Sequence, residues 1–136
     1  MAFVDGRDLP EKQVPPPFER ALKVVMSPET QKDVKDFTLL YSLLAPNGGC
    51  TDFHSHVESG ELMVFTSGVG KAWLDGVERD VGPGVAMYAP PGVEHKTMNT
   101  GDEPLTIVCV FVPPAPADYI SGNIDDANAT GGSDDR

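Results

Sequence analysis

The sequence predicts an all-β domain, a closed barrel or jelly roll, from its size, its turn residues and its hydrophobic alternation. A chain of 136 residues has room for one packed core, which its 40% of hydrophobic residues can fill. The 14 glycines and 13 prolines are spread along the chain and indicate short segments joined by tight turns. Alternating apolar and polar residues within these segments are typical of half-buried strands, and no amphipathic helix is apparent.

The chain divides into an arm, a barrel and a tail. The first twenty residues are polar and end in Pro15-Pro16-Pro17-Phe18, so we expect an extended arm over residues 1–20. An arm of this kind often packs across a neighbouring subunit, which favours a homodimer. The barrel is expected over residues 21–112, and residues 113–136 are expected to form a flexible acidic tail.

Turn residues separate the strand-like segments of the barrel. The loop Pro46-Asn47-Gly48-Gly49 precedes the densest part of the pattern, and Asp75-Gly76 is a strong hairpin signal. The expected strands span residues 21–26, 37–44, 51–57, 61–66, 70–74, 77–81 and 85–89, a segment through His95, and residues 105–112. This number of short strands in so short a region predicts a closed barrel.

Charge and composition exclude several function classes. A net charge of −11 argues against nucleic acid and against anionic membrane surfaces, because both carry negative charge. No stretch approaches the roughly 20 apolar residues of a membrane helix. The first residues lack the basic and apolar regions of a signal peptide, so we expect a cytoplasmic protein in which Cys50 and Cys109 form no disulfide.

The three histidines of the chain carry the strongest chemical signal. His54 and His56 are two residues apart, a spacing that puts both imidazoles on one face of a strand. Glu61 follows a Ser-Gly turn, and His95 follows a Pro-Pro-Gly turn. Three imidazoles and one carboxylate suit a divalent transition metal (iron, manganese, nickel, zinc or cobalt) with one or two coordination positions left open.

The spacing of these residues resembles the two motifs of the cupin superfamily. His54-x-His56, four residues, Glu61, six residues and Gly68 resemble the first motif. Gly84, five residues, Pro90-x-Gly92, two residues, His95, three residues and Asn99 resemble the second. The resemblance covers about residues 37–112 and implies a double-stranded β-helix barrel. It also implies that His54, His56, Glu61 and His95 are the metal ligands.

Strand alternation suggests which residues surround the metal. It places Met63 and Phe65 on the ligand face with Glu61, and Thr97 on that face with His95. Asp52 shares a face with His54 and His56 and is a candidate acceptor that fixes a histidine tautomer.

Other residues are weaker candidates for the site. Glu58 is an alternative ligand if the turn after His56 runs differently, and Asn99 is expected to brace a loop by hydrogen bonds. Tyr41, Trp73, Met87 and Cys109 are further candidates for the cavity wall, although each also suits an ordinary core position.

The expected function is a metal-dependent enzyme acting on a small organic molecule. The frequency of such chemistry in the family favours a dioxygenase-like oxidoreductase, and no acid–base residue is evident beside the ligands. The alternatives are an isomerase, lyase or decarboxylase, a small-molecule-binding cupin without turnover, and a purely structural barrel. The ligand set does not choose among the metals or the reactions.

Overall fold

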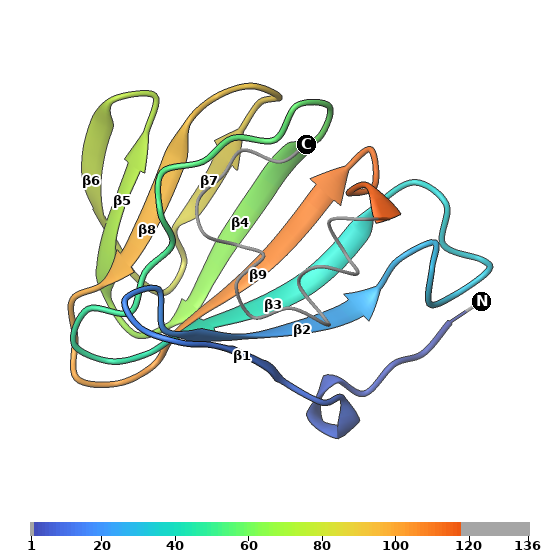
Figure 1. Cartoon of the computed structure of the whole chain (residues 1–136), viewed down its shortest axis with the longest axis horizontal. Coiled ribbons are helices and arrows are strands. Elements are labelled where there is room, and N and C mark those ends of the chain that lie inside the picture. Colours follow the sequence, from blue (N-terminus) through green and yellow to red (C-terminus); the bar gives the residue numbers. More distant parts are fainter. Residues whose placement is uncertain (1, 118–136) are drawn as a thin grey trace.

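The protein consists of two antiparallel β-sheets in a computed structural model that describes residues 2–117. Figure 1 shows the smaller sheet at one side of the larger one. The described elements are a 3₁₀ turn, η1 (Gly6–Asp8), and the strands β1 (Lys12–Val14), β2 (Arg20–Met26), β3 (Thr38–Leu44), β4 (Gly60–Ser67), β5 (Gly70–Leu74), β6 (Val77–Val81), β7 (Ala86–Ala89), β8 (His95–Asn99) and β9 (Leu105–Val112). The larger sheet has the order β1-β2-β3-β9-β4-β7, and the smaller has the order β6-β5-β8.

The core lies between the two sheets because strand alternation sends one set of side chains inward. On β9, Leu105, Ile107, Cys109 and Phe111 are buried, while the residues between them face outward. The same alternation holds along β3, which pairs with β9 over its whole length. The predicted all-β double-stranded β-helix is confirmed, and the predicted segments match β2 to β9 with small shifts at their ends.

The strand predicted over residues 51–57 is wrong. This segment makes one isolated bridge to β8, at His54 with His95, and another bridge just before it joins Cys50 to Met98. The Asp52 carboxylate accepts a hydrogen bond from the Phe53 N–H at 2.8 Å, and the Asp52 carbonyl lies 2.8 Å from Nδ1 of His54. Such local bonds compete with the ladder bonds of a strand, so the segment becomes an anchored loop.

The segment predicted as an arm contains η1 and β1. β1 pairs antiparallel with β2 and forms an edge of the larger sheet. The expected tail falls mostly on residues 118–136, which lie outside the described residues. Within the described part of the chain, no helix is long and apolar enough to cross a membrane.

Candidate metal centre

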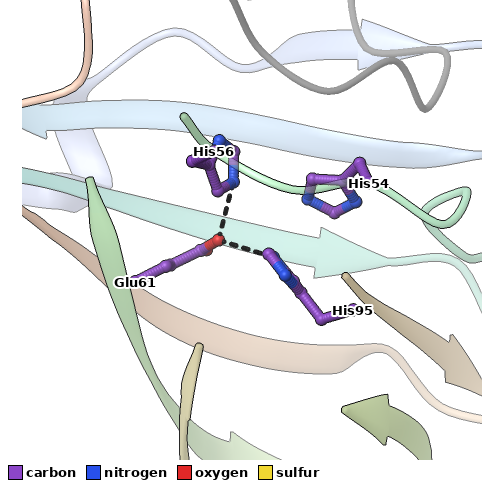
Figure 2. Close-up of side chains that lie close together, drawn as sticks. All are labelled: His54, His56, Glu61 and His95. Carbon is purple, nitrogen blue, oxygen red and sulfur yellow. Dashed lines mark hydrogen bonds and ion pairs between the residues drawn. The ribbon is translucent and has the colours of Figure 1, made fainter. Parts of the chain in front are cut away.

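Four side chains from three parts of the chain meet between the sheets. His54 and His56 come from the loop before β4, Glu61 from the start of β4, and His95 from the start of β8. One potential ligand atom from each residue lies within 4.8 Å of the others. Figure 2 shows the three imidazole rings arranged around the Glu61 carboxylate. The structure therefore brings together all four residues that the motifs indicated.

Glu61 contacts two of the histidines through one oxygen atom. Its Oε1 lies 3.0 Å from Nε2 of His56 and 3.1 Å from Nε2 of His95 (Figure 2). Two donor atoms held at about 2.1 Å from one ion and at right angles are about 3.0 Å apart. The spacing is thus the spacing of adjacent ligands around a single cation.

Main-chain carbonyls fix the orientation of two of the rings. Nδ1 of His54 lies 2.8 Å from the Asp52 carbonyl, and Nδ1 of His95 lies 3.0 Å from the Val93 carbonyl. A carbonyl only accepts, so each Nδ1 must carry the proton and donate. Nε2 of both neutral rings then presents a lone pair toward the cluster, which is the arrangement found in metal-ligating histidines.

The donor set fits a transition metal. In the neutral His95 ring, the Nε2 lone pair faces the Glu61 oxygen at 3.1 Å, and two acceptors at this distance repel each other. Either a proton on Nε2 or a cation between the two atoms removes this repulsion. Three imidazole nitrogens and a carboxylate oxygen are ligands that zinc, iron, nickel, cobalt and manganese accept.

Burial and mutual charge perturb the metal-free cluster. Burial, and then the nearby His95, lower the pKa of His54 to about 4. Burial acts to raise the pKa of Glu61, but hydrogen bonds from His56 and His95 hold it well below its usual value. Burial acts to lower the pKa of His95. The hydrogen bond to Glu61 and the negative charge of Glu61 have a larger combined effect, so the pKa of His95 is raised. Glu61 is therefore ionised and His54 neutral at pH 7.

A small cavity opens beside the cluster. Its volume is about 40 Å³, and its lining includes His54, Glu61 and His95. One water molecule needs roughly 10–15 Å³ of such a cavity, so the space has room for about three water molecules. The remaining wall comes from β2, β3, β4, β8 and β9 and from Thr51 of the anchored loop.

Two of the four expected pocket residues lie on the cavity wall. Met63 and Thr97 line it, as alternation from Glu61 and His95 predicts. Phe65 also faces inward, but it lies farther along β4 and packs in the core, 1% exposed. The Asp52 side chain does not line the cavity, because residues 51–57 do not alternate as a strand. Asp52 contacts His54 through its main-chain carbonyl instead of its carboxylate.

The weaker candidates are mostly elsewhere. Cys109 lines the cavity together with Glu61. Tyr41 lies on the opposite face of the larger sheet, where its ring touches Gly6. Trp73 donates to Glu78 at 3.1 Å, and Met87 borders a different pocket. Glu58 is exposed and stands outside the cluster.

Sequence reasoning missed Arg20 as a cavity residue. Arg20 is the first residue of β2, is 5% exposed, and lines the cavity together with Leu22. The inward alternation of Leu22 could have indicated it, because residue 20 lies on the same strand face. Because an arginine at a strand end is usually exposed to solvent, Arg20 was not predicted to line a cavity.

Comparison with known proteins identifies relatives in sequence. The family model described as "Cupin domain" matches residues 40–111. An uncharacterised protein of Methanocaldococcus jannaschii is 33% identical over 93 residues, which is 68% of this chain and 73% of that protein. The glucose-6-phosphate isomerase of Pyrococcus furiosus is 29% identical over 132 residues, covering 86% of this chain and 67% of the isomerase.

Solved structures share the fold at low sequence identity. A predicted oxalate decarboxylase of Thermotoga maritima superposes with a TM-score of 0.73 at 19% identity, covering 82% of this chain and 99% of the other. KdgF from a Halomonas species also gives 0.73 at 19% identity, covering 87% and 97%. At such identities these likenesses concern the arrangement of the strands alone.

Proposed function

This chain belongs to the cupin family, and we propose that it is a metal-dependent enzyme acting on a small organic molecule. His54, His56, Glu61 and His95 would hold one divalent transition metal. The observation that carries this proposal is the convergence of their four ligand atoms within 4.8 Å. A structural metal site would be closed by its ligands, whereas this cluster borders a cavity that would leave room for a small ligand.

The residues of the chain have separate tasks in this function. Glu61 and the three imidazoles hold the cation, and the Asp52 and Val93 carbonyls fix the tautomers of His54 and His95. A bound cation would supply a Lewis acid that polarises an oxygen-bearing substrate, and iron would add redox chemistry with dioxygen. Met63, Ile107 and Phe111 on the cavity wall would exclude bulk water.

Two reaction types remain as proposals. Dioxygenase-like oxidation is favoured by the cavity wall, whose titratable groups other than the cluster are Arg20 and Cys109. Burial, and then the charge of Glu61, raise the pKa of Cys109 well above its usual value, so this thiol is a poor acid or base at pH 7. Isomerisation is favoured by the name of a relative in sequence, the glucose-6-phosphate isomerase. Decarboxylation stays an alternative because the ligand set does not choose among these reactions.

Elemental analysis tests the metal site. Protein purified without chelator or nickel affinity resin should contain about one transition metal per chain, and His56→Ala should contain little. Metal-free protein in both preparations would overturn the proposal. Oxygen uptake with diketone, thiol and catechol substrates would support the dioxygenase, and conversion without oxygen uptake would support the isomerase or decarboxylase. Tight binding without any product would indicate a binding cupin.

The outer face of the larger sheet supports a homodimer. We define this face as the outward residues of β3, β4, β7 and β9: Leu39, Tyr41, Leu43, Leu62, Val64, Thr66, Ala86, Tyr88, Thr106, Val108, Val110 and Val112. None is charged, although the chain has a net charge of −11. A solvated sheet face normally carries polar residues. A second copy would cover this face with an identical uncharged one and leave the acidic surface in water.

A further inference from the structure

The cavity beside the metal cluster contains a buried arginine. Arg20 is 5% exposed and lines the cavity with His54, Glu61 and His95. Its Nη1 donates to the Phe18 carbonyl at 3.0 Å and reaches the Cys50 carbonyl at 3.5 Å. These contacts come from the segment before β2 and from the start of the anchored loop, and they orient the guanidinium from two sides.

Charge in the cavity favours an anion. Arg20 and Glu61 are the residues of its lining with full charges at pH 7, apart from protonation of the histidines. The Glu61 carboxylate is committed to the cluster, where it contacts His56 and His95. A divalent cation in the cluster would place a second positive charge beside the guanidinium of Arg20, and both charges would attract an anion in the cavity.

The field of Arg20 extends across the cavity. Arg20 on β2 and Cys109 on β9 both line this cavity, together with Glu61 of the cluster. The positive charge of Arg20 therefore lies on the wall of the same space as the cluster. A group of opposite charge that enters this space can accept charge-assisted hydrogen bonds from the guanidinium.

The planar shape of the guanidinium and the small volume of the cavity limit the class of ligand that can bind. A guanidinium presents a planar fork that matches a carboxylate. The volume of about 40 Å³ leaves space for a few non-hydrogen atoms beside the cluster. This space suits a short-chain acid better than a sugar phosphate.

We propose that Arg20 binds the carboxylate of the substrate, so that the enzyme acts on short-chain carboxylic acids whose neighbouring oxygen faces the metal cluster. The proposal rests on the metal-dependent function above and adds its substrate class. Arg20 is here a specificity-determining residue, and its effect should appear in binding as well as in turnover.

Calorimetric titration of the zinc-loaded protein tests this role. The probes are glycolate and its uncharged analogue glycolamide, which have the same size. In the wild type, Kd for glycolate should be at least tenfold lower than for glycolamide. Arg20→Gln should raise Kd for glycolate at least tenfold without changing Kd for glycolamide or the zinc content. Arg20→Lys, which keeps the charge without the planar fork, should give an intermediate Kd.

Lys23→Gln is the matched control. Lys23 lies on the same strand, but it faces outward and donates to the Gly6 carbonyl at 2.9 Å. Removing this charge should leave Kd for glycolate unchanged. Equal loss in both glutamine variants would indicate only a general charge effect and would overturn the proposal, as would unchanged binding in Arg20→Gln.

A measurement on the wild type covers the case in which Arg20→Gln fails to fold. The Nε–H resonance of Arg20 in the zinc-loaded protein should shift with glycolate and stay in place with glycolamide. An unmoved resonance at saturating glycolate would contradict the proposal. A wrong proposal for the metal site can be distinguished from a wrong role for Arg20. If the metal site is wrong, the wild type binds no zinc before any probe is added.

Discussion

His54 and His95 exchange two main-chain hydrogen bonds, from His54 N to His95 O at 3.0 Å and from His95 N to His54 O at 2.8 Å. Their ring centroids lie 4.2 Å apart. The loop that carries the first motif is therefore attached to the strand that carries the second by its backbone. The side chains are free to serve the cluster because they do not hold these segments together.

This attachment predicts that metal binding and folding separate in His54→Ala. The variant keeps both main-chain bonds, so its free energy of unfolding without metal should change by about 1 kcal/mol or less. Its affinity for zinc should fall at least tenfold, because one of four ligands is gone. Amide hydrogen exchange at residues 54 and 95 should show unchanged protection. Loss of that protection would mean that the ring itself anchors the loop.

In the metal-free protein, the pH dependence of the free energy of unfolding should reveal the lowered pKa of the buried His54 ring. Its pKa is about 4 in the folded chain and about 6.5 in the unfolded chain. Between these values the unfolded state binds more protons, so the free energy of unfolding rises with pH from about 4 to 6.5. His54→Asn should lose this part of the rise, which amounts to about 3 kcal/mol.

Urea denaturation in chelator at pH 4, 5, 6 and 7 measures the difference. The raised pKa of His95 acts in the opposite direction, because its stabilisation is complete below about 6.5 and is lost as pH rises through the folded value. His54→Asn should therefore alter the acid side of the profile and spare the alkaline side. Parallel profiles for the wild type and the variant on the acid side would refute the assignment.

The fold and the ligand set were predictable because both depend on local, periodic signals. Glycine and proline turns divided the chain into its strands, and the spacing of His54, His56, Glu61 and His95 identified the cluster. The loop over residues 51–57 was predicted as a strand, since alternation alone cannot show that the Asp52 carboxylate accepts a hydrogen bond from the Phe53 N–H.

The cavity wall depended on register and was harder to predict. Met63 and Thr97 were found by counting two residues from a ligand. Arg20 lines the cavity because β2 pairs with β3, with Arg20 opposite Leu44. The alternation from Leu22 gives its strand face, but the pairing that brings this strand to the cavity leaves no pattern in the sequence. Tyr41 and Trp73 were placed inside as aromatic residues, but each lies on the outer face of its strand.

A negative charge at position 99 should lower the stability of the fold. Its Nδ2 donates to the carbonyls of Leu44 at 2.9 Å and Glu103 at 2.8 Å, and its side chain is fully buried. Asn99→Asp would point a carboxylate oxygen at two carbonyls, so we expect a loss of about 3 kcal/mol or more in unfolding free energy at pH 7. The loss should shrink as pH falls, because this buried carboxyl would have a raised pKa.

Asn47→Asp is the control for this prediction. Asn47 is exposed and has a positive φ of 60°, which aspartate also tolerates. Its unfolding free energy, measured by urea denaturation, should stay within about 0.5 kcal/mol of the wild type. Equal effects at both sites would show that the bonds of Asn99 contribute nothing specific.

A charge on the outer face should dissociate the proposed homodimer. Leu62 lies in the middle of this face and is 39% exposed in the single chain. Leu62→Lys would bring two like charges together across a two-fold interface, so light scattering should show a monomer where the wild type is a dimer. Val77→Lys, at a 66% exposed position on the smaller sheet, should remain a dimer. A monomeric wild type would contradict the proposal directly.

Phe111 should link core packing to the position of His56. The ring is 1% exposed and meets the His56 ring edge-on, with centroids 4.9 Å apart and planes at 85°. Phe111→Ala should lower the unfolding free energy by about 3–5 kcal/mol, because it leaves a cavity in the core. Val77→Ala, on the smaller sheet and 66% exposed, should change it by about 0.5 kcal/mol or less.

Phe111→Leu distinguishes positioning of His56 from bulk stability. Leucine fills most of the volume and keeps the chain folded, but it offers no aromatic edge to the imidazole. Zinc affinity should then fall severalfold. The free energy of unfolding of the metal-free protein should decrease less in Phe111→Leu than in Phe111→Ala. If zinc affinity followed stability alone across Phe111→Leu, Phe111→Ala and Val77→Ala, the ring would be a packing residue without influence on the ligand. A drop in affinity larger than the change in stability requires that the contact itself orients His56 toward Glu61.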